Sequence, residues 1–265
     1  MLITRIVSAL VLIPLVAAAV WLGGAWLAGL AAIFAVLAVI EFYQLSRRLG
    51  ARPSVPLGAA LAAALVLSAL FPGYGIGPAA FAVALAGFMV ARVLRQDLGG
   101  FLTDWAVTLV GSAYVGGLLG YYVLLRNLSQ GLAWVVLALL VTWISDTAAY
   151  FVGSSIGRRP FFRRVSPRKT LEGAVGGVLI GTLAAMVIGA LALRLSWLEG
   201  AGLGLLLTLA TTFGDLAESL IKRQAGVKDS GRLIPGHGGA LDRVDSVLFA
   251  GVTVYYFAVL IGRAP

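Results

Sequence analysis

The sequence has little of the chemistry on which most soluble enzymes rely. Its 265 residues include no cysteine and only one histidine. Thiolate metal sites are therefore excluded, and a single histidine cannot build an imidazole metal site. Walker A, GxGxxG, HExxH and Ser-His-Asp elbow patterns are also missing, which removes the common soluble templates for phosphoryl transfer and hydrolysis.

Charge is scarce as well, and this scarcity identifies the solvent. Only 12% of the residues are charged, 60% are hydrophobic and the mean hydropathy is +1.00, which leaves too little polar surface to coat a soluble globule. Apolar runs of about 17–25 residues recur, each long enough to cross a ~30 Å hydrocarbon core. Period-two alternation is absent, which argues against a membrane barrel. The sequence therefore predicts an all-α fold, a polytopic integral membrane helical bundle.

The apolar runs predict about nine transmembrane helices, at residues 6–22, 25–45, 56–71, 79–95, 103–124, 131–152, 173–195, 201–222 and 246–262. The third is short and flanked by Pro53, Pro56 and Pro72, so a tilted or re-entrant segment is an alternative. The first resembles a secretory signal, but the eight spans after it favour a retained transmembrane helix.

Positive charge falls on one side of this expected topology. Seventeen of the twenty Lys and Arg residues lie in segments that share a side, and the other side holds only Arg126, Arg194 and Arg263. Because cytoplasmic loops hold Lys and Arg, we expect a cytoplasmic N-terminus and an outside C-terminus. This topology and an anionic leaflet explain the net charge of +9, so no nucleic-acid partner is expected.

Acidic residues concentrate in the second half of the chain. The first 140 residues hold three acids, whereas residues 143–245 hold the other eight together with all three lysines. We therefore expect residues 1–130 to be N-terminal transmembrane helices that serve in packing. Residues 131–265 should form a C-terminal catalytic region with two cytoplasmic loops.

The eighth span ends in a polar stripe, because four residues follow one another at i, i+3, i+4 and i+7 on one helix face: Asp215, Glu218, Ser219 and Lys222. Ionisable groups near hydrocarbon are costly unless they face a partner, a cavity or an ion, so they are read as functional. A structural Asp–Lys pair is the plain alternative. Asp146, in the sixth span, is ambiguous between a functional carboxylate and a packing device.

The loop after the sixth span, residues 153–173, combines six bases with hydroxyl groups, a pattern that suits phosphate oxygens. The alternative is a positive-inside loop that holds anionic lipid. We favour this alternative for the four arginines at 158, 159, 163 and 164. Phosphate binding is favoured for the residues at the mouth of the seventh span: Ser166, Arg168, Lys169 and Thr170.

The last loop surrounds His237 with glycines at 236, 238 and 239. Glycines allow backbone amides to approach an anion, although they could equally form a plain turn. Asp242 and Asp245 could cap the last helix. Beside basic residues, however, two carboxylates also suit a magnesium–nucleotide site. For His237 we expect a hydrogen bond within the loop or to a phosphate.

The longest pattern resembles the signature of phosphatidate cytidylyltransferases, also called CDP-diacylglycerol synthases: Ser219-x2-Lys222-Arg223-x4-Lys228-Asp229-x-Gly231-x2-Ile234-Pro235-x-His237-Gly238-Gly239-x2-Asp242-Arg243-x-Asp245. Two upstream segments look like further motifs of that family: Trp143-x2-Asp146-Thr147-x-Ala149-Tyr150-x2-Gly153 and Ser166-Pro167-x-Lys169-Thr170-x-Glu172-Gly173. The resemblance covers about residues 143–246.

This resemblance implies transfer of CMP from CTP to phosphatidate, with magnesium, at the cytoplasmic face of the inner (plasma) membrane. Asp215 and Asp242 are the first expected magnesium ligands, with Asp146 and Asp245 as further ligands or their supports. We expect six catalytic residues: Lys222, Asp215, Asp242, Ser219, Lys169 and Arg243. The other expected substrate contacts are Ser166, Arg168, Thr170, Arg223, Lys228, His237, Gly238 and Gly239.

CTP, phosphatidate and membrane lipids are thus the expected partners, and the family also allows a homodimer and a second cation. Three alternatives remain open at this stage. A CTP-dependent polyprenol or phytol kinase would present a neutral alcohol as acceptor. A secondary transporter of a cation or organic anion would place its carboxylates at mid-span. The third alternative is a catalytically silent lipid-binding scaffold.

Overall fold

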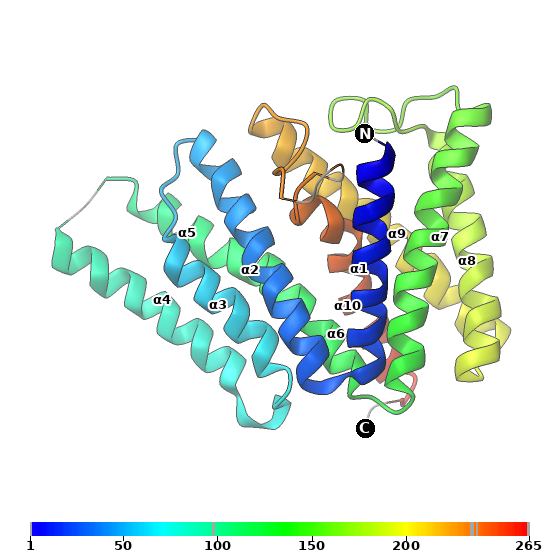
Figure 1. Ribbon diagram of the computed structural model, residues 1–265, viewed down its shortest axis with the longest axis horizontal. Coiled ribbons are helices and arrows are strands. Elements are labelled where there is room, and N and C mark those ends of the chain that lie inside the picture. Colours follow the sequence, from blue (N-terminus) through cyan, green and yellow to red (C-terminus); the bar gives the residue numbers. More distant parts are fainter. Residues whose placement is uncertain (1, 97–98, 234–235, 237, 264–265) are drawn as a thin grey trace. The chain divides into compact units, whose positions relative to one another are not determined.

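The structure is a computed structural model that describes every residue except 1, 97–98, 234–235, 237 and 264–265. For residues 2–7 and 9 it describes the backbone alone. Its described residues form helices and no strand, which confirms the all-α prediction (Figure 1). Seven of the described helical segments are long and apolar enough to cross a membrane, as a polytopic bundle requires. The helices are α1 (Leu2–Leu22), α2 (Gly24–Arg48), α3 (Val55–Ser68), η1 (Pro72–Tyr74), α4 (Ile76–Arg95), α5 (Phe101–Ser112), η2 (Ala113–Gly117), α6 (Leu118–Arg126), α7 (Gly131–Ile156), α8 (Leu171–Leu193), α9 (Trp197–Gln224) and α10 (Leu241–Leu260).

Each predicted span has a helical counterpart, with shifted ends. The third, α3, has only 14 residues, about 21 Å at 1.5 Å per residue, and Pro56 lies in its first turn. The fifth span is α5 and α6 joined by a short π-helical segment, η2. The last helix begins at Leu241 rather than at 246, so Asp242 and Asp245 both lie on it.

The chain divides into two compact units. The first contains residues 1–124 and 224–244, and the second contains residues 125–223 and 245–265. The last cytoplasmic loop expected from the sequence therefore folds with the N-terminal helices.

In the first unit, α2 packs closely against α3 and α5. Tyr43 donates to the Thr108 carbonyl oxygen over 2.6 Å, and its hydroxyl lies 2.8 Å from Ser112 Oγ. Gly58 admits the Tyr43 ring, since a Cβ at residue 58 would overlap it. Hydrogen bonds therefore join α2 to α5, and close packing joins it to α3.

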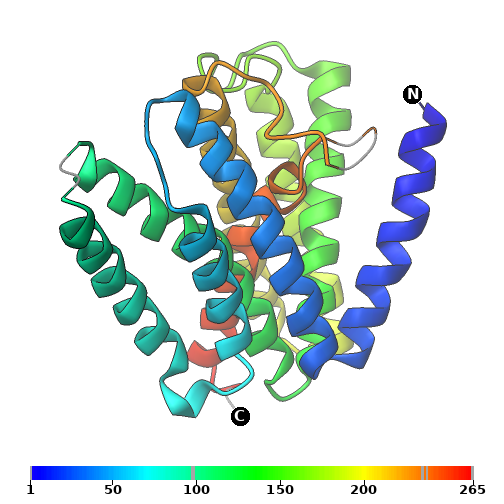
Figure 2. The same ribbon diagram turned by 60° about the vertical axis from the view of Figure 1, so that its left-hand side comes forward.

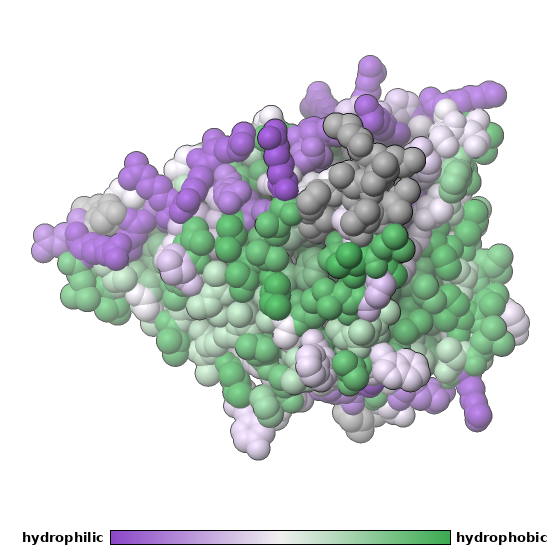
Figure 3. All heavy atoms as spheres, viewed as in Figure 1, coloured by the Kyte–Doolittle hydropathy of each residue, from purple (hydrophilic) through white to green (hydrophobic). Residues whose placement is uncertain are grey.

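Apolar side chains dominate the outer helices of the first unit. Val93 and Leu94 on α4 are 75% and 79% exposed, as expected of a helix that faces lipid. In Figure 3, green side chains cover the visible flank of α4 and purple ones gather at its end. Its last turn contains Arg92, which pairs with the buried Asp104 of α5. Asp104 also accepts a hydrogen bond from the Arg52 amide, so it is a structural acid.

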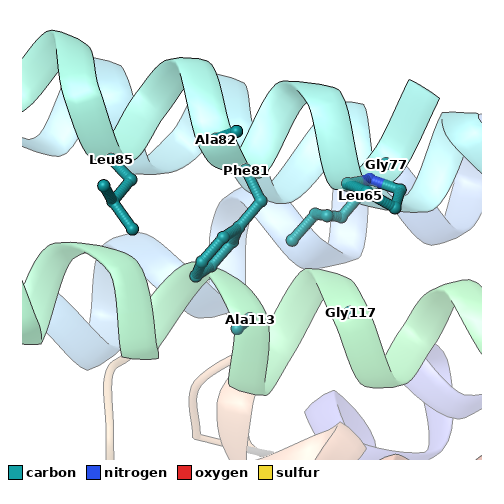
Figure 4. A pocket seen from close by; sticks show the side chains of 8 residues that line it. Leu65, Gly77, Phe81, Ala82, Leu85, Ala113 and Gly117 are labelled. Carbon is teal, nitrogen blue, oxygen red and sulfur yellow. The ribbon is translucent and has the colours of Figure 1, made fainter. Parts of the chain in front are cut away.

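A groove of about 530 Å³ opens between α3, α4 and the η2 segment. Figure 4 shows Phe81 and Leu85 projecting from α4 toward the helix that carries Ala113 and Gly117. Its lining contains no charged side chain: Leu65, Gly77, Pro78, Phe81, Ala82, Leu85, Ala113 and Gly117. Charge chemistry must therefore be sought elsewhere.

In the second unit, α7 and α8 lie side by side (Figures 1 and 2). A Cβ at Gly177 would meet Ala149 Cβ and the Ser145 carbonyl oxygen, both at 3.0 Å. Ser145 Oγ donates to the Gly177 carbonyl oxygen over 3.1 Å. Such close approach at small residues is how membrane helices gain packing contacts, and it fixes the part of α7 that carries Asp146.

Candidate active site

Seven of the predicted site residues lie in two polar clusters, one in each unit. The cluster of the second unit, called here the α9 cluster, consists of Asp146, Lys169, Asp215, Ser219 and Asp245. The cluster of the first unit, called here the Glu41 cluster, consists of Glu41, Ser230 and Asp242 with the backbone amides of Gly239 and Leu241.

Asp215 on α9 is the centre of the α9 cluster. Its Oδ2 pairs with Lys169 Nζ, and Ser219 Oγ, one turn later, lies 3.4 Å from its Oδ1. The Asp215 side chain is 28% exposed, so it is accessible while still held. The Lys169–Asp215 contact joins the loop before α8 to α9, and the sequence had not predicted it.

Two further carboxylates interact with Asp215. Asp146 of α7 repels it electrostatically, is attracted to Lys169 and accepts a hydrogen bond from the Ser246 hydroxyl. Asp245 of α10 repels both of these aspartates and is attracted to Lys222. Three carboxylates that repel one another close to the membrane need cations to stabilise them, and the two lysines supply part of that charge.

The α9–α10 contact explains why Asp245 comes so near. A Cβ at Gly214 would lie 2.8 Å from the Asp245 carbonyl oxygen, so only glycine allows the helices to approach this closely. Asp215 follows Gly214 directly in the chain. The close approach therefore places Asp215 and Asp245 on adjoining turns of the two helices.

Oxygen ligands of the kind that magnesium prefers are present in the α9 cluster. Among the described residues, however, no group of three or more acidic or histidine side chains converges closely enough to hold a metal by itself. Magnesium commonly binds through one or two carboxylates and completes its shell with substrate phosphates and water. The carboxylates of Asp215 and of Asp146 or Asp245 are of the kind that this mode uses.

Lys222 has a structural neighbour that the sequence stripe already contained. Its Nζ pairs with Glu218 Oε2, one turn earlier, and the Glu218 side chain is fully buried. The stripe at the end of α9 thus includes an Asp215–Ser219 contact and a Glu218–Lys222 pair. An Asp–Lys pair does form, as the structural alternative proposed, but the lysine that contacts Asp215 is Lys169 and not Lys222 of the same helix.

The loop between α7 and α8 is held at several points. The two sides of the loop meet at an isolated bridge between Pro160 and Thr170. Beside it, Phe161 N donates to the Lys169 carbonyl oxygen over 2.8 Å. Arg223 Nε donates to the Val165 carbonyl oxygen over 3.3 Å, which ties the loop to the end of α9. These contacts position Lys169 beside Asp215.

Other predicted loop residues show varied surroundings. Thr170 is the N-cap of α8, and its Oγ1 accepts a hydrogen bond from Gly173 N. Glu172 accepts hydrogen bonds from the amides of Arg158 and Arg159, so it orders the base-rich stretch. Ser166 is half-buried and Arg168 is exposed, where a soluble substrate could reach it.

The Glu41 cluster orders the last loop. Asp242 Oδ2 accepts hydrogen bonds from Ser230 N, Ser230 Oγ and Gly239 N, at 2.9, 2.9 and 2.8 Å. Gly238 has a φ of +85°, in the left-handed region that favours glycine, and a Cβ there would lie 2.8 Å from Asp242 Oδ2. The Gly239 amide is therefore engaged inside the loop, and Asp242 organises the start of α10.

Three more predicted residues belong to this loop and its helix. Lys228 and Arg243 are exposed, as substrate contacts need to be. His237 lies outside the described residues, so its expected hydrogen bond stays a prediction. The predicted set as a whole is divided between two units, with Asp242 in the first unit and Asp215 in the second.

Sequence reasoning missed Glu41. This side chain of α2 is only 5% exposed, and its Oε2 accepts hydrogen bonds from Ser230 Oγ and Leu241 N, each at 2.9 Å. An acid inside an apolar span is itself a signal of function, and that signal was available. Its partners were not predictable, because Ser230 and Leu241 follow it by 189 and 200 residues.

Comparison with known proteins identifies a family and several relatives. The model of the cytidylyltransferase family matches residues 3–261. A phosphatidate cytidylyltransferase of Synechocystis sp. is 35% identical over 286 aligned residues, which cover 97% of this chain and 96% of that protein. A phosphatidate cytidylyltransferase of Bacillus subtilis is 38% identical over 65% of this chain and 62% of its own length. An uncharacterised Escherichia coli protein is 40% identical over 66% of this chain and 61% of its own length.

The chain belongs to the cytidylyltransferase family. The match extends over the N-terminal helices, for which the sequence motifs alone had shown only a general likeness. Membership favours the transferase interpretation over the transporter and the silent scaffold.

Proposed function

We propose that this member of the cytidylyltransferase family transfers the CMP moiety of CTP to phosphatidate, which gives CDP-diacylglycerol and pyrophosphate. The α9 cluster carries the proposal, since it places Asp215 between Lys169 and Ser219, with two further carboxylates nearby. Two of the relatives are phosphatidate cytidylyltransferases, which supports the same substrate.

The reaction requires little covalent chemistry from the protein. A phosphomonoester has a second pKa near 6, so phosphatidate is largely dianionic near neutral pH. One of its oxygens attacks the α-phosphorus of CTP, the bond from that phosphorus to the bridging oxygen breaks, and pyrophosphate leaves with the electron pair. No proton has to be removed, and the total charge is unchanged. Positioning and charge neutralisation are therefore the main tasks of the protein.

Lysine and arginine side chains are suited to these tasks. Lys169 and Lys222, each paired with a carboxylate, are held at fixed places where they can also contact phosphate oxygens. The exposed Arg168 extends the basic surface of the same unit. The Ser219 hydroxyl can donate a hydrogen bond to a substrate oxygen, and α9 holds it next to Asp215.

Magnesium is the proposed cofactor. Asp215, Asp146 and Asp245 offer the hard oxygen ligands of the α9 cluster, and a bound Mg²⁺ would withdraw charge from the triphosphate. For Asp242 the metal role remains a prediction from the sequence. The proposed location is the inner membrane of the cell, with the site facing the cytoplasm, where CTP is available.

A labelling experiment separates the transferase from its nearest alternative. Purified protein in detergent is incubated with magnesium, phosphatidate and CTP that carries radioactive phosphorus at either the α or the γ position. A cytidylyltransferase moves only the α label into lipid, whereas a CTP-dependent kinase moves only the γ label, with a neutral lipid alcohol as acceptor. Chelation of magnesium should abolish the product. If the protein is folded and phosphatidate is present, the absence of α-labelled lipid would contradict the proposal.

A further inference from the structure

The contacts of Glu41 are unusual for an acid inside an apolar helix. Its carboxylate accepts hydrogen bonds from the Ser230 hydroxyl and from the Leu241 amide, which is the first residue of α10. Ser230 lies within the last loop, residues 225–240, and Leu241 follows that loop directly. One side chain of α2 therefore contacts two points of a segment that lies almost two hundred residues later in the chain.

Glycines of the loop make room for this carboxylate. A Cβ at Gly231 would lie 2.7 Å from Glu41 Cδ, and the three atoms it would approach most closely all belong to Glu41. A Cβ at Gly239 would lie 2.6 Å from the same atom. Gly231 has no positive φ, so its backbone does not itself demand glycine. The requirement for glycine at 231 thus comes from the side chain on α2.

Ser230 links Glu41 to Asp242. Its Oγ lies 2.9 Å from Glu41 Oε2 and 2.9 Å from Asp242 Oδ2. A hydroxyl carries one proton, so the two carboxylates share a single donor there. The Ser230 amide supplies Asp242 with a second hydrogen bond, and the orientation of Asp242 depends on where Glu41 places Ser230.

We propose that Glu41 is a positioning residue for the reaction: it fixes the last loop through Ser230 and Leu241, and through Ser230 it orients the Asp242 carboxylate. This inference rests on the proposed function and on the substrate contacts that the sequence predicts for this loop. It extends the functional set to α2 and assigns Gly231 a steric role as the residue that admits the Glu41 carboxylate.

The test uses three variants and a control. Glu41→Ala removes both hydrogen bonds, and Gly231→Ala leaves Glu41 in the chain but displaces its carboxylate. Glu41→Gln keeps the size and an acceptor oxygen. Gly29→Ala is the control, because Gly29 lies on the same helix as Glu41 and a Cβ there meets nothing within 4 Å. All variants are assayed as the purified full chain, at temperatures well below their melting points.

Glu41→Ala and Gly231→Ala should each lower kcat by about 10- to 100-fold, the range expected when a catalytic group is displaced by roughly 1 Å. Glu41→Gln and Gly29→Ala should keep most of the turnover. The double variant Glu41→Ala/Gly231→Ala should be no worse than Glu41→Ala, because the atoms that the new methyl group would hit are gone. Additive losses in the double variant would contradict the steric role.

A second readout does not depend on activity. The chain has no native cysteine, so a nitroxide can be attached at a single exposed position, Arg232→Cys. Its spectrum should show a more mobile loop in Glu41→Ala and Gly231→Ala than in the unaltered background or in Gly29→Ala. If Glu41→Ala does not fold, Gly231→Ala against Gly29→Ala carries the same comparison.

The two proposals fail in different ways. Failure of the unaltered protein to form CDP-lipid would overturn the proposed function, while the nitroxide spectra would still test the Glu41 contacts. Formation of CDP-lipid at the unaltered rate by folded Glu41→Ala and Gly231→Ala would overturn the positioning role and leave the proposed function standing.

Discussion

Asp215 combines a cation, a hydroxyl and two like charges around one accessible carboxylate. Such an arrangement favours a group that exchanges partners when substrate arrives, because Lys169 can turn from Asp215 to a phosphate once another cation neutralises the carboxylate. A purely structural ion pair would have no need for the two other aspartates. The neighbouring carboxylates are thus the feature that distinguishes this pair from a helix-packing device.

Replacing Asp215 with Asn tests this interpretation, since the change keeps the size and removes the charge. We expect Asp215→Asn to fold and to insert into the membrane but to lose about 100-fold or more in turnover, as when a main charge-stabilising contact is removed. Glu199→Gln is the control, because Glu199 lies in the first turn of the same helix and accepts hydrogen bonds from the amide and hydroxyl of Ser196. Magnesium-dependent turnover of the two purified variants is the measurement, and equal activity would contradict the metal role of Asp215.

A pair of variants can separate the pairing of Lys222 with Glu218 from its proposed contact with phosphate. Lys222→Met leaves the fully buried Glu218 without this cation, so it should cost about 3–5 kcal/mol of stability and also lower kcat and CTP affinity. Adding Glu218→Gln removes the buried charge and should restore much of the stability without restoring turnover. Melting temperature and kcat/KM for CTP, measured on both variants, decide the point. Recovery of activity together with stability would show that Lys222 acts only through Glu218.

At the scale of helices, hydrophobic runs predicted the existence of every span, and their charged ends misplaced the boundaries. The start of α10 is the clearest case. The apolar run begins after Asp245, yet the helix begins at Leu241, which is fully buried and donates its amide to Glu41. Asp242 then lies in the first turn, where a carboxylate is stabilised by the helix dipole. Tertiary contacts therefore decided a boundary that hydropathy could not.

The candidate site was predictable only in part, because the spacing of residues along a helix gives local information alone. Local spacing placed Asp215 and Ser219 on one face, and the structure confirms that they are neighbours. Spacing carries no information about contacts between distant segments. The structure was therefore needed to identify the contacts of Lys169 with Asp215 and of Ser230 with Glu41. The π-helical turn at η2 also has no counterpart in apolar periodicity.

Packing between α7 and α8 can be tested at Gly181. A Cβ at this position would lie 2.9 Å from Ser145 Cβ and would also overlap Thr208 of α9. We expect Gly181→Val to destabilise the protein by about 1–3 kcal/mol, as overpacking usually does. Gly87→Val on α4 is the control, because a Cβ at Gly87 meets nothing within 4 Å. Thermal unfolding in detergent measures both, and equal melting temperatures would contradict the close approach of the helices.

At the scale of the whole molecule, the distribution of charge connects membrane topology with chemistry. The predicted cytoplasmic side holds seventeen of the twenty basic residues, and it includes both loops from which the proposed phosphate contacts come. A single preference for positive charge could thus serve orientation in the membrane and attraction of two anionic substrates. The same positive charge can serve both purposes only if both loops lie on the same side of the bilayer.

Single cysteines can test that condition, because the chain has none of its own. Substitutions at Arg48, Arg163 and Asp229 should react with a membrane-impermeant maleimide only when the cytoplasmic side is open to it. Substitutions at Gly75 and Glu199 should react in intact cells from the outside. Reaction of all five after the membrane is dissolved in detergent controls for accessibility. Labelling of residues 163 and 229 from opposite sides would contradict the shared orientation of the two loops, because positive charge and substrate contacts would then lie on different faces of the membrane.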